Sequence, residues 1–517
     1  ASSRDGEIRG AGERDRTSGL LITSQPAWRF NIICFHTQYH KKTIYNNTIY
    51  INNRIDILTA YGLRSSHKRG AIMFKREILR RLADWKDKPD RKPLVLRGAR
   101  QVGKTTAVEL FSAAYDQFIS LNLEKPEEAK LFARSLPAAD RLQAIRFFKG
   151  LPSIQGRTLL FLDEVQNSPE AVSSLRYFHE DLPGLHVIAA GSLLEIALTQ
   201  KQIGIPVGRV EYALMSPLSF REFLEATGET QALEALDVVP APDFALPRLM
   251  DLFHRYALVG GMPEIVAHYA GHRDAVALAP LYRSLWTSFL DDIPKYARNE
   301  TMKRVIRHCL EAAPLEAGER IKFAGFGRSN YRSREAGESL RTLEQAMLLH
   351  LLAPTEIPLI PDRRKSPKLL FLDIGLINYT AGIQGHYFEY PDLYSFYRGR
   401  IAEMIVGQEL IAADPEHHRP VFWVREKSQA PAEVDYVLQH ASLAVPVEVK
   451  AGAKGTLKSL HQFINRCPHG FAVRLYAGPL EIARTKTPEG KPYCLLNLPY
   501  CFAGKLRAYI RWMIESA

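Results

Sequence analysis

The sequence has 517 residues, of which 46% are hydrophobic and 24% are charged. These proportions are typical of a soluble globular protein, and the length exceeds what one hydrophobic core can serve, so we expect about three domains. No apolar run approaches the roughly 18 residues that a membrane span needs. The five cysteines are scattered, without a Cys-x-x-Cys pair. Composition therefore argues against membrane insertion, a disulfide framework and a zinc site, and favours a cytoplasmic protein with reduced thiols.

The first 72 residues supply half of the net charge of +12, because they contain eleven Lys and Arg but only five Asp and Glu. This uneven distribution weakens the net charge as a sign of nucleic-acid binding. The segment shows no clear hydrophobic period, and the first methionine of the sequence is Met73. We predict that residues 1–72 are an upstream extension and that the working protein begins near Met73.

A glycine-rich loop follows the first predicted strand. The apolar run Pro93–Leu96 leads into the sequence GARQVGKT at Gly98–Thr105, and a helix-forming stretch begins at Thr106. Glycines let such a loop curl until its backbone N–H groups point at a phosphate, and the helix start adds its positive end. The order strand, loop, helix predicts ATP or GTP binding, whereas the alternative is a glycine turn with a solvated lysine. The residues expected to bind nucleotide are Gly98, Ala99, Arg100, Gln101, Val102, Gly103, Lys104, Thr105 and Thr106.

Two acids end a later apolar strand of the same predicted domain. Asp163 and Glu164 follow the run Thr158–Leu162. Strands that alternate with helices predict a parallel sheet, which binds ligands at the carboxyl ends of its strands. We expect Lys104 to reach the β- and γ-phosphates and Thr105 and Asp163 to hold Mg²⁺, while Glu164 orients or deprotonates the attacking water. The alternative is an acidic cap without catalytic duty. Further strands are predicted at Phe118–Leu123 and His186–Ala190.

Six motifs occur in an order that resembles one family. They are GARQVGKT at 98–105, LLFLDEVQ at 159–166, AAGSLLE at 189–195, GRV at 208–210, PLSFREFL at 217–224 and GGMPE at 260–264. The chain from Met73 onward resembles prokaryotic AAA-type ATPases that carry a characteristic C-terminal domain of undetermined function. This resemblance implies ATP as the nucleotide, Asp163 as a magnesium ligand and Glu164 as the residue that activates water.

The resemblance also draws attention to Arg209. An arginine at this place is either a finger that acts in trans within a homo-oligomer, where it stabilises transferring phosphoryl charge, or a structural salt-bridge partner. Gln166 and Ser192 are weaker candidates for sensing the γ-phosphate. The fourth strand ends in Ala190, Gly191 and Ser192, where many AAA proteins have a polar asparagine, so the resemblance does not assign the sensor.

The middle of the sequence is predominantly helical. Helices are predicted at Leu278–Ile293, Met302–Ala312 and Ser333–Ala346, and short strands at Leu348–Leu352 and Leu369–Leu372. A basic segment, 361–367, separates the two strands. Helices followed by a basic hairpin outline a winged helix, and the motif KLLFLDIGL at 368–376 supports this interpretation by resemblance. DNA phosphates could be contacted by the hairpin and by Arg328, Arg332, Arg334 and Arg341, although a solvated charged face is the commoner meaning of such a pattern.

Three acids and a lysine characterise the C-terminal region. Glu403 lies on a predicted helix, Arg400–Ala412, and Asp435 lies in a predicted strand. Glu448 and Lys450 would share one face of the next strand because side chains alternate with a period of two. The thirteen residues from Asp435 to Glu448 suit adjacent antiparallel strands. Such strands would gather carboxylates for a divalent metal beside a lysine that polarises or deprotonates water.

These residues resemble the core of the restriction-endonuclease-like superfamily, the Asp…Glu-x-Lys nucleases. The resemblance implies metal ligation by Glu403, Asp435 and Glu448 and catalysis by Asp435, Glu448 and Lys450. The fold is often kept after its chemistry is lost, so an inactive domain is the alternative.

Together these features predict an α/β protein. We expect an extension at 1–72, a P-loop ATPase domain with a parallel sheet at 73–270, a helical or winged-helix-like region at 271–389, and an α/β restriction-endonuclease-like domain at 390–517. One hypothesis is an ATPase that uses Mg²⁺-dependent ATP hydrolysis to drive or gate a C-terminal nuclease-like module that acts on DNA. The other is a nucleotide-dependent switch or scaffold whose inactive C-terminal domain binds a protein partner. The expected partners are DNA, another protein or further copies of the chain, and no membrane.

Overall fold

The computed structural model describes residues 74–194, 196–197, 204, 208–357, 359–383, 400–414, 419–426, 431–452 and 456–517. All of them belong to one unit, Leu63–Ala517. The predicted extension at 1–72 lies outside the described residues. Within the described part of the chain, no helix combines the length and apolarity that crossing a bilayer requires.

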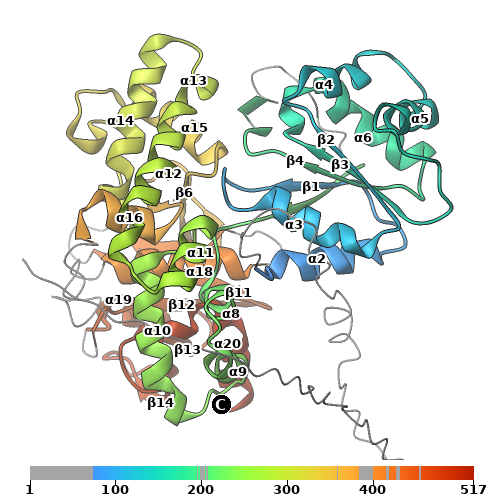
Figure 1. Ribbon diagram of the computed structural model, residues 1–517. Coiled ribbons are helices and arrows are strands. Elements are labelled where there is room, and N and C mark those ends of the chain that lie inside the picture. Colours follow the sequence, from blue (N-terminus) through green and yellow to red (C-terminus); the bar gives the residue numbers. More distant parts are fainter. Residues whose placement is uncertain are drawn as a thin grey trace, which may run out of the picture. The chain divides into compact units, whose positions relative to one another are not determined.

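A five-stranded parallel sheet forms the first part of the structure (Figure 1). The strand order is β2-β3-β4-β1-β5, and every neighbouring pair runs parallel. This confirms the parallel sheet and the strands expected from the sequence. The strands are β1 (Leu94–Arg97), β2 (Gln117–Asn122), β3 (Thr158–Asp163), β4 (His186–Ala190) and β5 (Glu211–Leu214).

Both faces of this sheet are buried, and successive side chains of a strand belong to different hydrophobic clusters. On β3, Leu159 and Phe161 belong to one hydrophobic cluster, whereas Leu160 and Leu162 belong to another. The period of two in a strand produces this division, and helices on both faces explain why β3 is buried throughout. The first cluster includes residues of α2 (Glu77–Lys86) and α3 (Lys104–Phe111); the second includes residues of α4 (Pro126–Ala133), α5 (Ala138–Phe148) and α6 (Pro169–Asp181).

The middle of the chain is helical, as predicted, and ends in a two-stranded antiparallel sheet. This sheet pairs β6 (Leu349–Leu352) with β9 (Lys368–Phe371). The helices are α8 (Phe220–Ala226), α9 (Thr230–Asp237), α10 (Leu246–Val259), α11 (Pro263–His272), α12 (Ala279–Asp291), α13 (Ile293–Tyr296), α14 (Glu300–Glu316), α15 (Ser333–Gln345) and α16 (Ile374–Thr380).

The segment between β6 and β9 differs from a simple wing. It forms two further strands, β7 (Pro354–Glu356) and β8 (Ile360–Pro361), and β7 pairs in parallel with β10 of the next sheet. The sequence indicated the two outer strands because they are apolar, but β7 is short and begins at a proline. Its place was therefore not predicted.

An eight-stranded mixed sheet forms the last part of the structure, in the order β14-β15-β13-β12-β11-β10-β7-β8. The predicted antiparallel pairing of the strands that carry Asp435 and Glu448 is confirmed. The C-terminal strands are β10 (Val421–Arg425), β11 (Ala432–His440), β12 (Leu443–Val449), β13 (Phe471–Tyr476), β14 (Glu481–Lys486) and β15 (Pro492–Pro499). The helices are α18 (Arg400–Ala413), α19 (Lys458–Ile464) and α20 (Leu506–Glu515).

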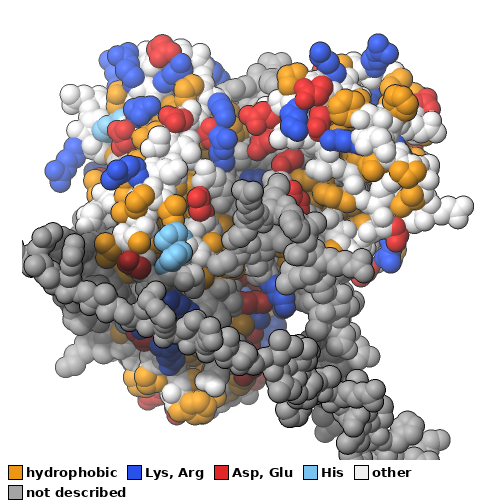
Figure 2. Space-filling model, viewed as in Figure 1, with side chains coloured by type: hydrophobic (Ala, Val, Ile, Leu, Met, Phe, Trp, Pro, Cys, Tyr) orange, Lys and Arg blue, Asp and Glu red, His pale blue; other side chains and the backbone are white. Residues whose placement is uncertain are grey.

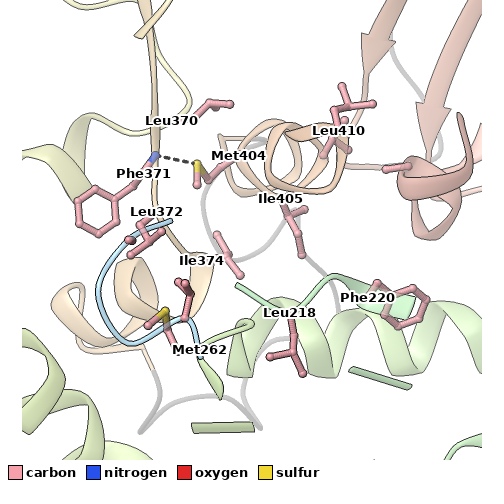
Figure 3. Packing of buried hydrophobic residues seen from close by; sticks show 14 of the residues in the cluster. Leu218, Phe220, Met262, Leu370, Phe371, Leu372, Ile374, Met404, Ile405 and Leu410 are labelled. Atoms are coloured by element: carbon pink, nitrogen blue, oxygen red, sulfur yellow. Dashed lines mark hydrogen bonds between the residues drawn. The ribbon is translucent and has the colours of Figure 1, made fainter. Parts of the chain in front are cut away.

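The motifs PLSFREFL, GGMPE and KLLFLDIGL meet in the core. The Leu218 N–H donates to the Gly261 carbonyl oxygen over 2.7 Å, and the Gly261 N–H donates to Asp373 Oδ2 over 2.6 Å. A Cβ on Gly261 would lie 2.2 Å from the Leu218 carbonyl oxygen, so this position requires glycine. Figure 3 shows Leu218, Met262 and Ile374 in the surrounding hydrophobic cluster. The motifs therefore have a structural role in holding distant segments together.

Candidate nucleotide-binding site and a buried acid cluster

The predicted phosphate loop lies between β1 and α3, at the carboxyl edge of the parallel sheet. Gly103 adopts a left-handed conformation, with φ of 93°, as the residue that precedes α3. Gln101 also has a positive φ, 65°. Such angles turn the chain sharply, which is the backbone conformation that a phosphate-binding loop needs to direct its N–H groups inward.

Lys104 is folded into the loop that precedes it. Its Nζ donates to the carbonyl oxygens of Gly98 and Ala99 over 3.0 and 2.8 Å. Burial of the side chain lowers the pKa of Lys104 to about 8, and the negative charges of Glu164 and Asp163 oppose this shift. A phosphate in the loop would raise the pKa again because it supplies negative charge beside the ammonium group.

Thr105 near the start of α3 and Asp163 at the end of β3 are in direct contact. Thr105 Oγ1 donates to Asp163 Oδ2 over 2.8 Å, and Asp163 Oδ1 accepts from the Glu164 N–H over 3.0 Å. Both side chains carry hard oxygen ligands, which suit Mg²⁺ beside phosphate oxygens. These residues fit the magnesium position of a triphosphate site.

Glu164 is held in an unusual backbone conformation directly after β3. It has a φ of 51°, and its Oε2 accepts from Gln166 Nε2 over 2.5 Å. A non-glycine residue in the left-handed region is uncommon and is enriched at functional sites. Gly191, at the end of β4, lies against the same glutamine, because an added Cβ would be 2.2 Å from Gln166 Oε1. The three predicted candidates Glu164, Gln166 and Ser192 therefore come from neighbouring strand ends.

Two loop side chains, Arg100 and Gln101, contact helix α12 and the residue that caps it. Arg100 forms an ion pair with Asp292, and Gln101 Nε2 donates to Ser288 Oγ over 3.0 Å. The ion pair raises the pKa of Arg100 through its hydrogen bond to Asp292. No role was predicted for Asp292 from the sequence, because its position beside a helix end gave no sign of a distant partner.

Arg209 lies away from the phosphate loop. It precedes β5 at the amino edge of the sheet, whereas the loop follows β1 at the carboxyl edge. Its Nε donates to Glu180 Oε1 over 2.7 Å. This ion pair matches the structural alternative predicted for Arg209, and the trans finger stays a prediction.

The C-terminal candidates converge on an acid cluster, which we define as Glu403, Glu433, Asp435, Glu448, Lys368 and Lys450; Lys368, Asp435 and Glu448 are buried, and the other three are half-buried. Asp435 Oδ2 accepts from the Val449 N–H over 2.7 Å, and Glu448 Oε1 accepts from Lys450 Nζ over 2.6 Å. Burial raises the pKa of Glu448 to about 8 and that of Glu403 to about 7, and the charge of Asp435 adds to both shifts. The predicted grouping of these acids is therefore present in the structure.

Lys368 was missed as a member of this cluster. Its Nζ lies 2.9 Å from Glu403 Oε2 and 3.0 Å from Glu433 Oε1, and the side chain is 1% exposed. In the sequence Lys368 is the first letter of an apolar strand motif, which gave no sign of distant acids. Among the described residues, no three His, Cys, Asp or Glu side chains lie where they could hold a metal ion. The cluster as arranged does not fit the predicted metal.

Basic side chains lie among acidic, hydrophobic and other side chains on the visible face of the middle helices (Figure 2). Figure 2 shows Lys and Arg side chains over the region of α13 to α15. All four predicted DNA contacts are exposed: Arg328, Arg332, Arg334 and Arg341. The Arg341 guanidinium lies 5.4 Å from the centre of the Phe323 ring. The exposure of these arginines is compatible with phosphate binding and with a solvated face.

Three segments of the chain match known protein families. Residues 90–224 match a family described as an AAA domain. Residues 90–224 form an AAA-type ATPase domain. Residues 250–387 and 398–488 match two families that are each described as a domain of unknown function, DUF8612 and DUF4143. These two matches assign no chemistry to the rest of the chain.

Solved structures give only weak likenesses. The Walker-type ATPase PABY2304 of Pyrococcus abyssi is 16% identical, with a TM-score of 0.40, and the match covers 62% of this chain and 99% of that one. The Aeropyrum pernix ORC2 protein in ADPNP-ADP complexes is 12% identical, with a TM-score of 0.32, and the match covers 63% and 98%. Scores this low support no argument about this chain. Among curated proteins none matches the sequence.

Proposed function

We propose that the AAA-type domain binds ATP with Mg²⁺ in the loop at 98–106 and hydrolyses it. The observation that carries the proposal is the contact between Thr105 and Asp163, which joins the end of the phosphate loop to the end of β3. Lys104 would exchange the loop carbonyl oxygens for β- and γ-phosphate oxygens, and the start of α3 would face the phosphates. Bound Mg²⁺ would neutralise charge on the phosphates.

Glu164 is the residue that we propose to orient and deprotonate the attacking water. Its carboxylate follows directly after Asp163 on the same strand end, and the hydrogen bond from Gln166 fixes its direction. A base of this kind contributes typically 10²–10⁴-fold to the rate. Binding of ATP does not require this base, so a variant of Glu164 should bind ATP but turn it over slowly.

The test is ATP turnover by the full chain and by Glu164→Gln, with ATP binding measured in parallel. We expect Glu164→Gln to bind ATP with unchanged affinity and to turn over at least about 100-fold more slowly. Glu124→Gln, on the exposed turn that follows β2, is the matched control and should hydrolyse ATP at the wild-type rate. Wild-type turnover by Glu164→Gln would refute the role of Glu164 as base.

For the C-terminal domain we propose that it does not cleave nucleic acid in the described state, as expected for a nucleotide-dependent switch or scaffold that binds a protein partner. The specific observation is Lys368, whose ammonium group is bound by Glu403 and Glu433 and lies 3.6 Å from Asp435 Oδ1. The test is incubation of the protein with duplex, single-stranded and branched DNA in Mg²⁺ or Mn²⁺. We expect no cleavage by the wild type, and cleavage that disappears in Asp435→Ala and Lys450→Ala would contradict the proposal.

A further inference from the structure

When all four of its acids are ionised, the acid cluster carries more negative charge than its two lysines can balance. Glu403, Glu433, Asp435 and Glu448 contribute four carboxyl groups, whereas Lys368 and Lys450 contribute two ammonium groups. When all six groups are ionised, two negative charges remain in excess. Buried charge of this kind is costly unless a cation or protons compensate it.

One carboxylate oxygen of the cluster can accept a further partner. Glu448 is 5% exposed, and its Oε2 makes no hydrogen bond within the described part of the chain, whereas its Oε1 binds Lys450. A buried carboxylate oxygen without a donor is rare in folded proteins. This oxygen, together with the excess charge of the fully ionised cluster, is available to a cation.

Lys368 supplies the positive charge at the centre of this group. Its Nζ contacts three of the four acids, and its side chain lies 5.5 and 5.7 Å from the ring centres of Phe422 and Tyr436. Carboxylate oxygens that surround an ammonium group also suit a hard divalent cation, because Mg²⁺, Mn²⁺ and Ca²⁺ all prefer oxygen ligands.

We propose that Lys368 closes the acid cluster to divalent metal, so that its ammonium group and a cation of the Mg²⁺ and Mn²⁺ class are alternative occupants of one site. This inference rests on the proposed state of the C-terminal domain and is independent of ATP hydrolysis. It accounts for a convergence of described acids whose arrangement does not suit a metal ion. The cluster binds metal only when Lys368 is removed or withdrawn.

The lysine is carried by a segment from outside the C-terminal sheet. Lys368 begins β9, which pairs with β6, and Asp373 follows β9 and accepts the Gly261 N–H. The GGMPE loop and the middle helices are therefore joined to the residue that controls the cluster. A displacement of β9 would withdraw the ammonium group and expose the carboxylates to metal.

The test is Mn²⁺ titration of the nucleotide-free full-length chain, with bound Mn²⁺ measured by electron paramagnetic resonance. Lys368→Met removes the charge and keeps most of the side-chain length. We expect it to bind Mn²⁺ at least about tenfold more tightly than the wild type. Lys365→Met, three residues earlier and paired with Glu356, is the matched control and should bind as the wild type does. The double variant Lys368→Met with Asp435→Asn should lose the gain.

Equal Mn²⁺ affinity in the wild type and Lys368→Met would overturn the proposal, as would an undiminished gain in the double variant. Loss of Lys368 leaves buried acids without a partner, so the variant is expected to melt at a lower temperature. Mn²⁺ should then raise the melting temperature of Lys368→Met more than that of the wild type, and a variant that Mn²⁺ does not stabilise contradicts the inference. ATP turnover in the same samples separates this result from the ATPase proposal, because Lys368→Met should retain it.

Discussion

Thr105 Oγ1 donates a hydrogen bond of 2.8 Å to Asp163 Oδ2, which joins two residues that are 58 positions apart in the sequence. Parallel neighbours β1, β4 and β3 bring the phosphate loop and the acidic strand end to the same edge of one sheet. This contact preorganises the two oxygen ligands that we assign to Mg²⁺. Preorganised ligands lower the cost of binding because less freedom is lost when the ion arrives.

Asp163→Asn should weaken the dependence of ATP binding on magnesium. The amide keeps the shape of the carboxylate but removes its negative charge, which is worth about 1.5–3 kcal/mol in a charge-assisted contact. We expect ATP affinity in excess Mg²⁺ to fall about 10-fold or more, with little change in EDTA. Titration calorimetry with and without Mg²⁺ measures both values. Ser112→Ala, a hydroxyl loss directly after α3, should leave them unchanged, and an equal loss of affinity in EDTA would contradict the assignment.

Asp292→Asn should increase ATP affinity. Asp292 is buried and forms an ion pair with Arg100, so it competes with phosphate for this loop arginine. Partly exposed ion pairs are worth up to about 1 kcal/mol, which corresponds to an increase of about two- to fivefold. Asp291→Asn, at the exposed neighbouring position, is the control. Unchanged affinity in Asp292→Asn would show that the pair does not restrain Arg100.

Glu409→Gln should remove part of the pH dependence of stability. Burial raises the pKa of Glu409 to about 7, and its Oε1 accepts from the Phe220 N–H and the Tyr256 hydroxyl. The native state therefore holds a proton that the unfolded chain releases. Its stabilising contribution is complete below the unfolded pKa of about 4.5 and is lost as the pH rises to about 7.

The size of this effect follows from the shift. The rise in the pKa of Glu409 from 4.5 to about 7 corresponds to a change of about 3 kcal/mol in the free energy of unfolding across that pH range. Urea unfolding at several pH values measures it, and the slope for Glu409→Gln should be flatter than that for the wild type. Other buried acids shift in the same direction, so the difference between the two proteins isolates Glu409. Glu234→Gln, at an exposed position, should keep the wild-type slope, and an equally steep slope in Glu409→Gln would refute the account.

Gly261→Ala should destabilise the fold. The added Cβ would meet the Leu218 carbonyl oxygen at 2.2 Å, so the backbone of a packed core must shift. Overpacking of this kind costs typically 1–3 kcal/mol. Gly184→Ala, where an added Cβ meets nothing within 4 Å, is the matched control and should change stability by less than about 0.5 kcal/mol. Thermal unfolding compares the two variants.

The sequence predicted the parallel sheet, and the meeting of the glycine loop and Asp163 at one edge of it, because these signals are local. Pro93–Leu96, the glycine loop and Asp163 each follow from a short apolar run and its end, and the antiparallel strands of Asp435 and Glu448 follow from spacing. Lys368, Asp292 and β7 could not be predicted, since their roles depend on partners far away in the sequence. A buried lysine is recognised only when the acids around it are known, and nothing local to Lys368 indicates them.

The most direct test of the central claim is calorimetric titration of the nucleotide-free chain with MgATP. We predict one site per chain that is lost in Lys104→Ala and kept in Lys130→Ala, at an exposed position of α4. Lys104→Ala removes the ammonium group that donates to the carbonyl oxygens of Ala99 and Gly98 over 2.8 and 3.0 Å. A folded wild-type chain that shows no heat of binding, or equal binding in Lys104→Ala, would contradict the assignment of this loop as the triphosphate site.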